Sequence, residues 1–163
     1  CSLCEQKYHG AVFCALGWAC WKTYLGRPET DLFRSGAMTI LGSSLCDANH
    51  YEDALAVQEA QVSMMKRVGV SELQVLIAQN NLAATYSRLG RPETLRMKQD
   101  VYTGYLKRFG EEHEDTIITA NNYAASLIDS QRFKEARSLM RKMMPVAQRV
   151  LGERARLTLK SRW

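Results

Sequence analysis

Apolar residues recur at intervals of three and four along most of the chain, which is the spacing of amphipathic helices. No segment shows the sustained alternation of apolar and polar residues that is typical of strands. The pattern therefore predicts an all-α fold. The expected helices cover residues 10–25, 30–48, 51–68, 72–88, 92–109, 114–129, 133–151 and 154–163.

Four glycines follow the long helices at a nearly constant interval. They are Gly26, Gly69, Gly110 and Gly152. A glycine directly after a helix suits the left-handed conformation that closes many helix C-termini. The sequence therefore predicts a repeat of about 42 residues, each ending at one of these glycines.

A second marker keeps step with the glycines. Gly42, Ala83 and Ala124 are evenly spaced at nearly the same interval, and each falls in the first helix of a predicted pair. Small residues allow two helices to approach closely, whereas larger side chains would force them apart. Two markers with one period predict a repeated hairpin of antiparallel helices, in which these three positions face the partner helix.

The repeat divides the chain into units of two helices. Tyr51, Pro92 and Phe133 are expected to open the second helices, and Pro145 is expected to bend the last long helix without ending it. The predicted organisation is an N-terminal remnant at 1–9, a partial unit at 10–29, full units at 30–70, 71–111 and 112–152, and the start of another unit at 153–163.

Two segments carry a resemblance to a known family. They read NNLAATYSRLGRPETL at 80–95 and NNYAASLIDSQRFKEA at 121–136, and the linkers FGEEHEDT and VLGERARLT follow the long helices. These segments resemble kinesin light chain-type tetratricopeptide repeats, whose period is longer than that of the ordinary repeat. The resemblance implies a right-handed superhelical stack of hairpins, an α-solenoid with a concave groove lined mostly by first helices.

The resemblance also implies which residues face that groove. They are Thr39, Ser43, Cys46 and Asp47 in the first full unit, Ile77, Asn80, Ala84, Ser87 and Arg88 in the second, and Ile118, Asn121, Ala125, Ile128 and Asp129 in the third. The candidate partner contacts among them are Thr39, Asp47, Asn80, Ser87, Arg88, Asn121 and Asp129.

Asn80 and Asn121 are the most informative of these positions. An amide both donates and accepts hydrogen bonds, so a row of amides can hold an extended peptide by its backbone. The alternative is that they bridge neighbouring helices, which is the role we expect for Asn81 and Asn122. A clamp for a C-terminal carboxylate is disfavoured, because Arg88 is the one cation among these positions and two carboxylates lie nearby in the predicted groove.

The chain opens with Cys1-Ser-Leu-Cys4, a spacing that lets two thiolates reach one metal ion. CSLCEQKY resembles the last ligand pair of a RING-CH zinc finger, and the resemblance implies that zinc would bind only with ligands upstream of Cys1. Two alternatives stay open: a local zinc site that adds His9 and Cys14, or two thiols without a ligand.

The distribution of charge along the chain bears on the kind of partner that it binds. The net charge is +5, and residues 132–163 hold ten Lys and Arg against two acidic residues. Most of these cations fall at helical spacing around an apolar stripe, so a solvated helix face is expected; docking of an acidic partner and association with RNA are the alternatives. Nothing interleaves aromatic with basic residues, so nucleic acid is disfavoured.

Five cysteines, an odd number, indicate reduced thiols and a cytoplasmic protein, with Cys14, Cys20 and Cys46 as buried small side chains.

No catalytic motif stands out. The sequence lacks a glycine-rich phosphate loop, a G-x-S-x-G elbow and an H-E-x-x-H pair, and His9, His50 and His113 stand singly in predicted turns. No apolar run is long enough to cross a membrane. We therefore expect a non-enzymatic scaffold that binds a protein or peptide, with apolar ends that favour self-association. The alternative is the substrate-recruiting region of a RING-CH ubiquitin ligase.

Overall fold

The computed structural model describes residues 8–152, and this part of the chain forms seven α-helices and no strand. Each of the seven predicted helices in this range is confirmed, with only small differences at the ends. The eighth, at 154–163, and most of the predicted N-terminal remnant lie outside the described residues. The helices are α1 (Gly10–Tyr24), α2 (Leu32–Asp47), α3 (Tyr51–Val68), α4 (Glu72–Arg88), α5 (Thr94–Phe109), α6 (Glu114–Asp129) and α7 (Phe133–Leu151).

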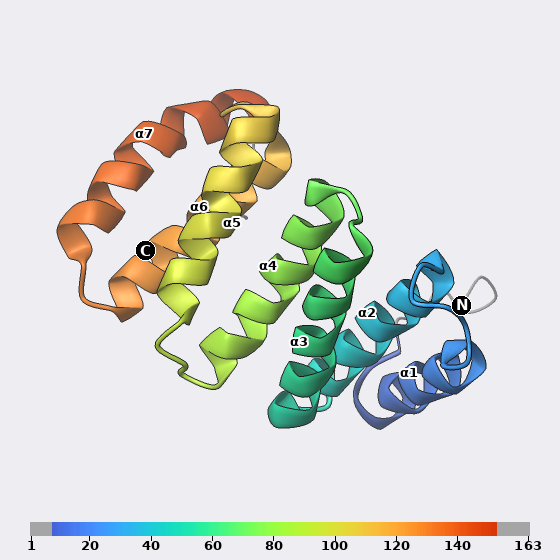
Figure 1. The fold of residues 1–163 in the computed structure, drawn as a ribbon. Helices are drawn as coiled ribbons and strands as arrows, with labels where there is room; N and C mark the ends of the chain where they lie inside the picture. The colour runs from blue at the N-terminus through green and yellow to red at the C-terminus, as the bar shows by residue number, and fades with distance from the viewer. Residues whose placement is uncertain (1–7, 153–163) are drawn as a thin grey trace. The chain divides into compact units, whose positions relative to one another are not determined.

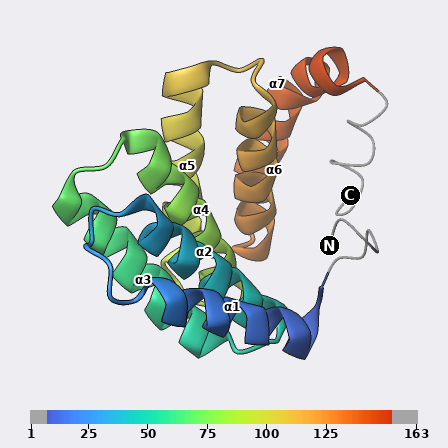
Figure 2. The same cartoon turned by 90° about the vertical axis from the view of Figure 1, so that its right-hand side faces the viewer.

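The chain divides after Leu89 into two compact parts, the first holding α1 to α4 and the second holding α5 to α7. In the first part, α2 packs against both α1 and α3, and α3 packs against α4 (Figures 1 and 2). In the second part, α6 packs against both α5 and α7. Neighbouring helices in sequence are thus neighbours in space within each part, and the predicted all-α helical-repeat class is confirmed.

The periodic small residues lie where the helices are closest. Ala83 and Ala124 are 0% exposed, and Gly42 is buried as well. A Cβ atom placed on Gly42 would lie 2.9 Å from Cγ of Gln58 on α3, so this position has no room for a larger side chain. The prediction that this position faces a partner helix is confirmed for Gly42, and Ala124 lies in the core cluster that α6 forms with α5 and α7. The helix that Ala83 faces stays a prediction.

A further periodic feature lies in the turns between first and second helices. Asn49, Gly90 and Gln131 are evenly spaced along the chain, and they have positive φ angles of 64°, 63° and 58°. After α2, the His50 N–H donates to the Leu45 carbonyl at 2.8 Å, and after α6 the Arg132 N–H donates to the Leu127 carbonyl at 2.7 Å. This is the hydrogen bond of the Schellman motif, which requires a left-handed residue just before the donor.

The glycines after the long helices have positive φ in three cases out of four. The φ angles are 74° at Gly69, 79° at Gly110 and 53° at Gly152, but only Gly69 has the left-handed helical conformation that was predicted, because ψ is −179° at Gly110 and −129° at Gly152. The prediction for Gly26 is wrong, because α1 ends at Tyr24 with Leu25 in the right-handed conformation. The chain then continues as a turn in which the Arg27 N–H donates to the Tyr24 carbonyl at 3.1 Å, and this turn needs no left-handed glycine.

Polar side chains fix where several helices begin. The Asp31 carboxylate accepts a hydrogen bond from the Phe33 N–H at the start of α2, which lowers the pKa of that carboxyl. His113 caps α6, because its Nδ1 accepts a hydrogen bond from the Asp115 N–H at 3.2 Å. Tyr51 and Phe133 open their helices as expected, but Pro92 lies just before α5, which begins at Thr94.

Pro145 lies within α7, and the helix continues through it to Leu151. Proline removes one backbone donor and crowds the preceding turn, which bends a helix. In Figure 1 the last, deep red turns of α7 point in a different direction from its first turns. The predicted bend without a break is confirmed.

Gly17 marks a close contact between helices, where α1 lies against α2. A Cβ atom there would collide with Oγ of Ser44 and lie 3.2 Å from Cα of Leu41. We expect Gly17→Ala to destabilise the chain by about 1–3 kcal/mol, because overpacking outweighs the gain in helix propensity. The matched control is Gly36→Ala in α2, where a Cβ meets nothing within 4 Å. Urea unfolding should show the control unchanged or more stable; equal stability of both variants contradicts the close α1–α2 contact.

Gln131 occupies a left-handed position that glycine occupies at residue 90. Its side chain is exposed, so nothing else in the turn depends on it. We expect Gln131→Gly to stabilise the chain by about 0.5–1 kcal/mol, because glycine removes the steric cost of positive φ. Gly90→Ala should have the opposite effect on the melting temperature. A lower melting temperature for Gln131→Gly would refute the left-handed turn.

Candidate functional site

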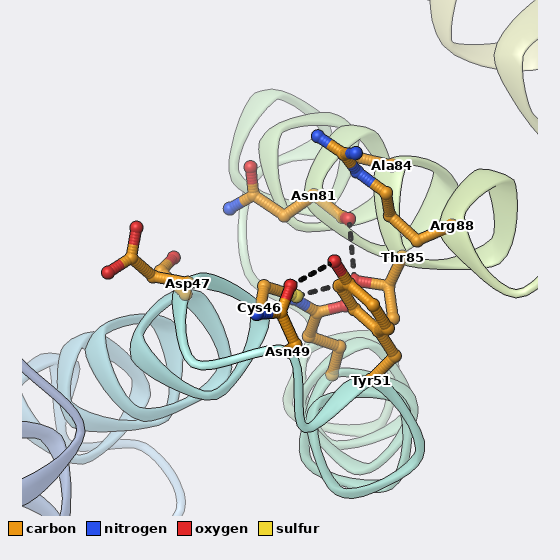
Figure 3. A pocket seen from close by; sticks show the side chains of 10 residues that line it. Cys46, Asp47, Asn49, Tyr51, Asn81, Ala84, Thr85 and Arg88 are labelled. Atoms are coloured by element: carbon orange, nitrogen blue, oxygen red, sulfur yellow. Dashed lines mark hydrogen bonds between the residues drawn. The ribbon is translucent and has the colours of Figure 1, made fainter. Parts of the chain in front are cut away.

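A cleft of about 460 Å³ lies in the first compact part. It lies where α2 and α4, both of which pack on α3, contact each other. Figure 3 shows the cleft with side chains from α2, from the start of α3 and from α4 around it. The lining residues are Ser43, Cys46, Asp47, Asn49, Tyr51, Gln58, Asn81, Ala84, Thr85 and Arg88.

The floor of the cleft is polar and uncharged. The Cys46 sulfur lies 3.0 Å from Oγ1 of Thr85, and Nε2 of Gln58 lies 3.8 Å from the same sulfur. Thr85 and Gln58 are both buried, and Oγ1 of Thr85 also lies 3.4 Å from the Asn81 carbonyl oxygen. The floor therefore offers a thiol, a hydroxyl and an amide to any group that enters.

The rim of the cleft holds the more exposed polar groups. Asn81 and Arg88 project from α4, and Tyr51 donates a hydrogen bond from its hydroxyl to Oδ1 of Asn49 at 2.6 Å (Figure 3). Arg88 is exposed, and within residues 8–152 no carboxylate pairs with it. The side-chain amide of Asn81 is half-buried and likewise has no hydrogen-bond partner in that range. Both groups are available to a ligand.

Asp47 lines the cleft, but its carboxylate is engaged elsewhere. Oδ2 accepts a hydrogen bond from the Gly10 N–H at 2.5 Å, and Oδ1 lies 3.6 Å from Nδ1 of His9. A carboxylate at a helix N-terminus satisfies a free backbone donor and interacts favourably with the helix dipole. Asp47 thus fastens the start of α1 to the end of α2, and Arg88 is the dominant free charge among the cleft residues.

The structure brings together part of the predicted groove. Ser43, Cys46, Asp47, Ala84 and Arg88 line the cleft, whereas Thr39, Ile77, Asn80 and Ser87 do not.

Thr39, and Asn81 in relation to Asn80, differ from the roles that the sequence predicted for them. The Thr39 hydroxyl accepts from Nε2 of Gln61 at 2.6 Å and donates to the Ser35 carbonyl at 3.3 Å, so it joins α2 to α3. Asn81, expected to be structural, lines the cleft in place of Asn80.

The predicted groove residues of the third unit belong to the second compact part. Ala125 is buried against the core, Ile128 and Asn121 are half-buried, and Asp129 is exposed. Ile118 is also half-buried. The contacts of a ligand with these residues stay a prediction.

Besides Asn81, four cleft residues were not anticipated from the sequence: Asn49, Tyr51, Gln58 and Thr85. Gln58 follows Ala54 by one helical turn on the packing side of α3, and Thr85 follows Leu82 in the same way on α4. A polar residue within an apolar stripe is the signal that could have identified both. Asn49 and Tyr51 carry no comparable signal.

The metal-site hypothesis falls largely outside the described part of the chain, since Cys1 and Cys4 are not included. His9 lies against Asp47, and Cys14 packs against the core cluster of α2 and α3. Within residues 8–152, no group of three or more His, Cys, Asp or Glu side chains is placed to hold a metal ion. Cys14, Cys20 and Cys46 are free and half-buried, so they are less enclosed than predicted.

The basic C-terminal segment has the expected character on α7. Lys142 pairs with Glu111 at 2.5 Å, Arg149 pairs with Glu112 at 2.5 Å, and Arg132 pairs with Glu135 at 2.6 Å. The hydrogen bond to Glu111 raises the pKa of the Lys142 ammonium. All of these cations are exposed, which agrees with a solvated helix face.

Comparison with known proteins identifies one family. Residues 116–154, which cover most of α6 and all of α7, match the family model of the tetratricopeptide repeat. No curated protein matches the chain. None of the helices in residues 8–152 has the length and apolar character needed to cross a bilayer. Tetratricopeptide repeats generally mediate protein–protein interactions. Residues 116–154 are therefore similar to a tetratricopeptide repeat, and the helical-repeat fold of the described residues agrees with that similarity.

Proposed function

We propose that this chain is a non-enzymatic scaffold that binds a segment of a partner protein in the cleft between α2 and α4. The observation that carries the proposal is the pair of polar groups, Asn81 and Arg88, at the rim of a cleft built by successive first helices. Neither side chain has a partner within residues 8–152. Five of the positions that the resemblance assigns to the groove line this cleft: Ser43, Cys46, Asp47, Ala84 and Arg88.

The dimensions and chemistry of the cleft suit an extended peptide. Its volume of about 460 Å³ is within the range of ligand pockets and accommodates a short stretch of chain. The Asn81 amide can donate to a peptide carbonyl and accept from a peptide N–H. Arg88 adds hydrogen-bond donors and a positive charge that attract carbonyl or carboxylate oxygens.

The cleft does not resemble a catalytic centre. Its one thiol, at Cys46, has a hydroxyl and an amide as its polar neighbours, and neither is a general base. This supports binding rather than covalent chemistry.

Two finer assignments accompany the proposal. The long period of the repeat supports placing the units in the kinesin light chain-type subgroup. The resemblance further implies a ligand contact at Asn121 in the second compact part, whereas the cleft favours Asn81 over Asn80 in the first. The alternative role, substrate recruitment in a zinc-finger ubiquitin ligase, rests on Cys1 and Cys4 alone.

Filling the cleft should weaken binding without unfolding the chain. Ala84 is exposed and lines the cleft, so Ala84→Trp places a large ring in the space that the peptide needs. We expect a peptide selected from a displayed random library to bind this variant at least about tenfold more weakly, a loss of about 1.4 kcal/mol. Ala60→Trp, at an exposed α3 position outside the cleft, is the control. Equal binding by both variants in fluorescence anisotropy would place the peptide elsewhere.

The two adjacent asparagines of α4 should differ in importance. Because Asn81 lines the cleft and Asn80 does not, we expect Asn81→Ala to weaken peptide binding by about five- to tenfold, the worth of one hydrogen bond. Asn80→Ala should change the affinity by less than about twofold. The opposite order in titration calorimetry would favour the assignment from the sequence.

A further inference from the structure

Two glutamines on α3 are almost fully buried, and they differ in one respect. Gln61 is 2% exposed, and its Nε2 donates to the Ser35 carbonyl at 2.9 Å and to Oγ1 of Thr39 at 2.6 Å. Gln58 is 3% exposed, and its Nε2 reaches only the Cys46 sulfur at 3.8 Å. Its Oε1 has no hydrogen-bond partner within the described residues.

The unpaired oxygen of Gln58 is unfavourable for the fold. A buried amide oxygen without a donor costs about 1–3 kcal/mol, and sulfur is a weak partner for the other end of the amide. An apolar side chain would avoid this loss. The nearest backbone also makes room for Gln58, because a Cβ on Gly42 would lie 2.9 Å from its Cγ. Stability therefore gives no reason for an amide at this position.

The position of Gln58 supplies a reason. Gln58 lines the cleft floor beside Cys46 and Thr85, so its buried amide borders the site where a partner segment would enter. A polar atom that is buried, unpaired and part of a cleft is poised to accept a hydrogen bond from an incoming group.

The neutrality of the floor limits what that group can be. A charged side chain would be buried next to Cys46, Thr85 and Gln58 without a counter-charge, which is costly. An apolar side chain would leave Oε1 of Gln58 unpaired. Rotation of the amide by half a turn exchanges its oxygen and nitrogen, so a group that both donates and accepts satisfies either orientation. Hydroxyls and primary amides have this property.

We propose that the cleft floor is a specificity subsite for an uncharged hydroxyl or primary amide side chain, Ser, Thr, Asn or Gln, of the partner segment, and that Gln58 is its hydrogen-bonding group. This inference rests on the proposed function of the cleft and adds the chemical class of one bound residue. Cys46 and Thr85 complete the subsite.

The test is selection of a displayed random peptide library on the full chain and on two matched variants. Wild type should enrich Ser, Thr, Asn or Gln at one peptide position. Gln58→Met, with a similar length and no amide, should lose that preference in favour of apolar residues and melt at the same or a higher temperature. Gln61→Met, outside the cleft, removes an amide whose Nε2 bonds both the Ser35 carbonyl and Oγ1 of Thr39, so it should melt lower and keep the wild-type preference.

A double-mutant cycle gives the size of the effect. Changing the enriched peptide residue to Ala should weaken binding to wild type about tenfold but binding to Gln58→Met less than twofold. Gln58→Glu provides a second variant of the same shape. Its carboxylate has no donor, so the selected residue should change to Lys or Arg.

The outcomes separate the two proposals. The subsite is overturned if peptides bind Ala84→Trp more weakly than wild type but show the same residue preference on wild type, Gln58→Met and Gln58→Glu. The cleft function is then intact, and the Gln58 amide would serve a bound water. Peptides that bind Ala84→Trp as well as wild type overturn the cleft function itself. Loss of the preference for Ser, Thr, Asn or Gln in both Gln58 variants supports the subsite.

Discussion

The close approach of neighbouring helices is the constraint on which both compact parts depend. At Gly17 and Gly42 even one additional carbon would meet a neighbouring helix, and at Ala83 and Ala124 the methyl groups are completely enclosed. Close packing at these positions sets the separation of the helix pairs, because well-packed interiors leave no void that could absorb a shift. The cleft exists at its observed size because α2 and α4 are held at this separation on α3.

The sequence contains most of the information on the fold, because the fold is repetitive. Gly42, Ala83 and Ala124 keep the same size class at the same interval, so their packing role is visible without coordinates. The left-handed turn residues keep an equally regular interval, but Asn49, Gly90 and Gln131 have different chemistry, and the regularity lies in a backbone angle that one-letter codes do not show. Gly26 illustrates the converse, since it is glycine at the right interval in a turn that does not need one.

The candidate site was less accessible from the sequence, for a geometric reason. Successive side chains of an α-helix are rotated by about 100° about the helix axis. Near the edge of a helix face, periodicity alone therefore does not decide whether Asn80 or Asn81 lines the cleft. The importance of Gln58 depends on the absence of a partner for one atom within the described residues, which is a property of its surroundings. Gln61 has the same chemistry and almost the same burial, yet its amide nitrogen is fully engaged. Only coordinates distinguish the two.

Asp47 connects the cleft to the first helix of the chain. Its two carboxylate oxygens are directed at the Gly10 N–H and the His9 ring, so the carboxylate cannot also turn toward a ligand without releasing them. A partner that draws Asp47 inward must leave the first turn of α1 without its acceptor. A cationic group in the cleft would therefore promote fraying of the first turn of α1. A ligand with a neutral group beside Asp47 leaves the hydrogen bond from the Gly10 N–H to Asp47 in place.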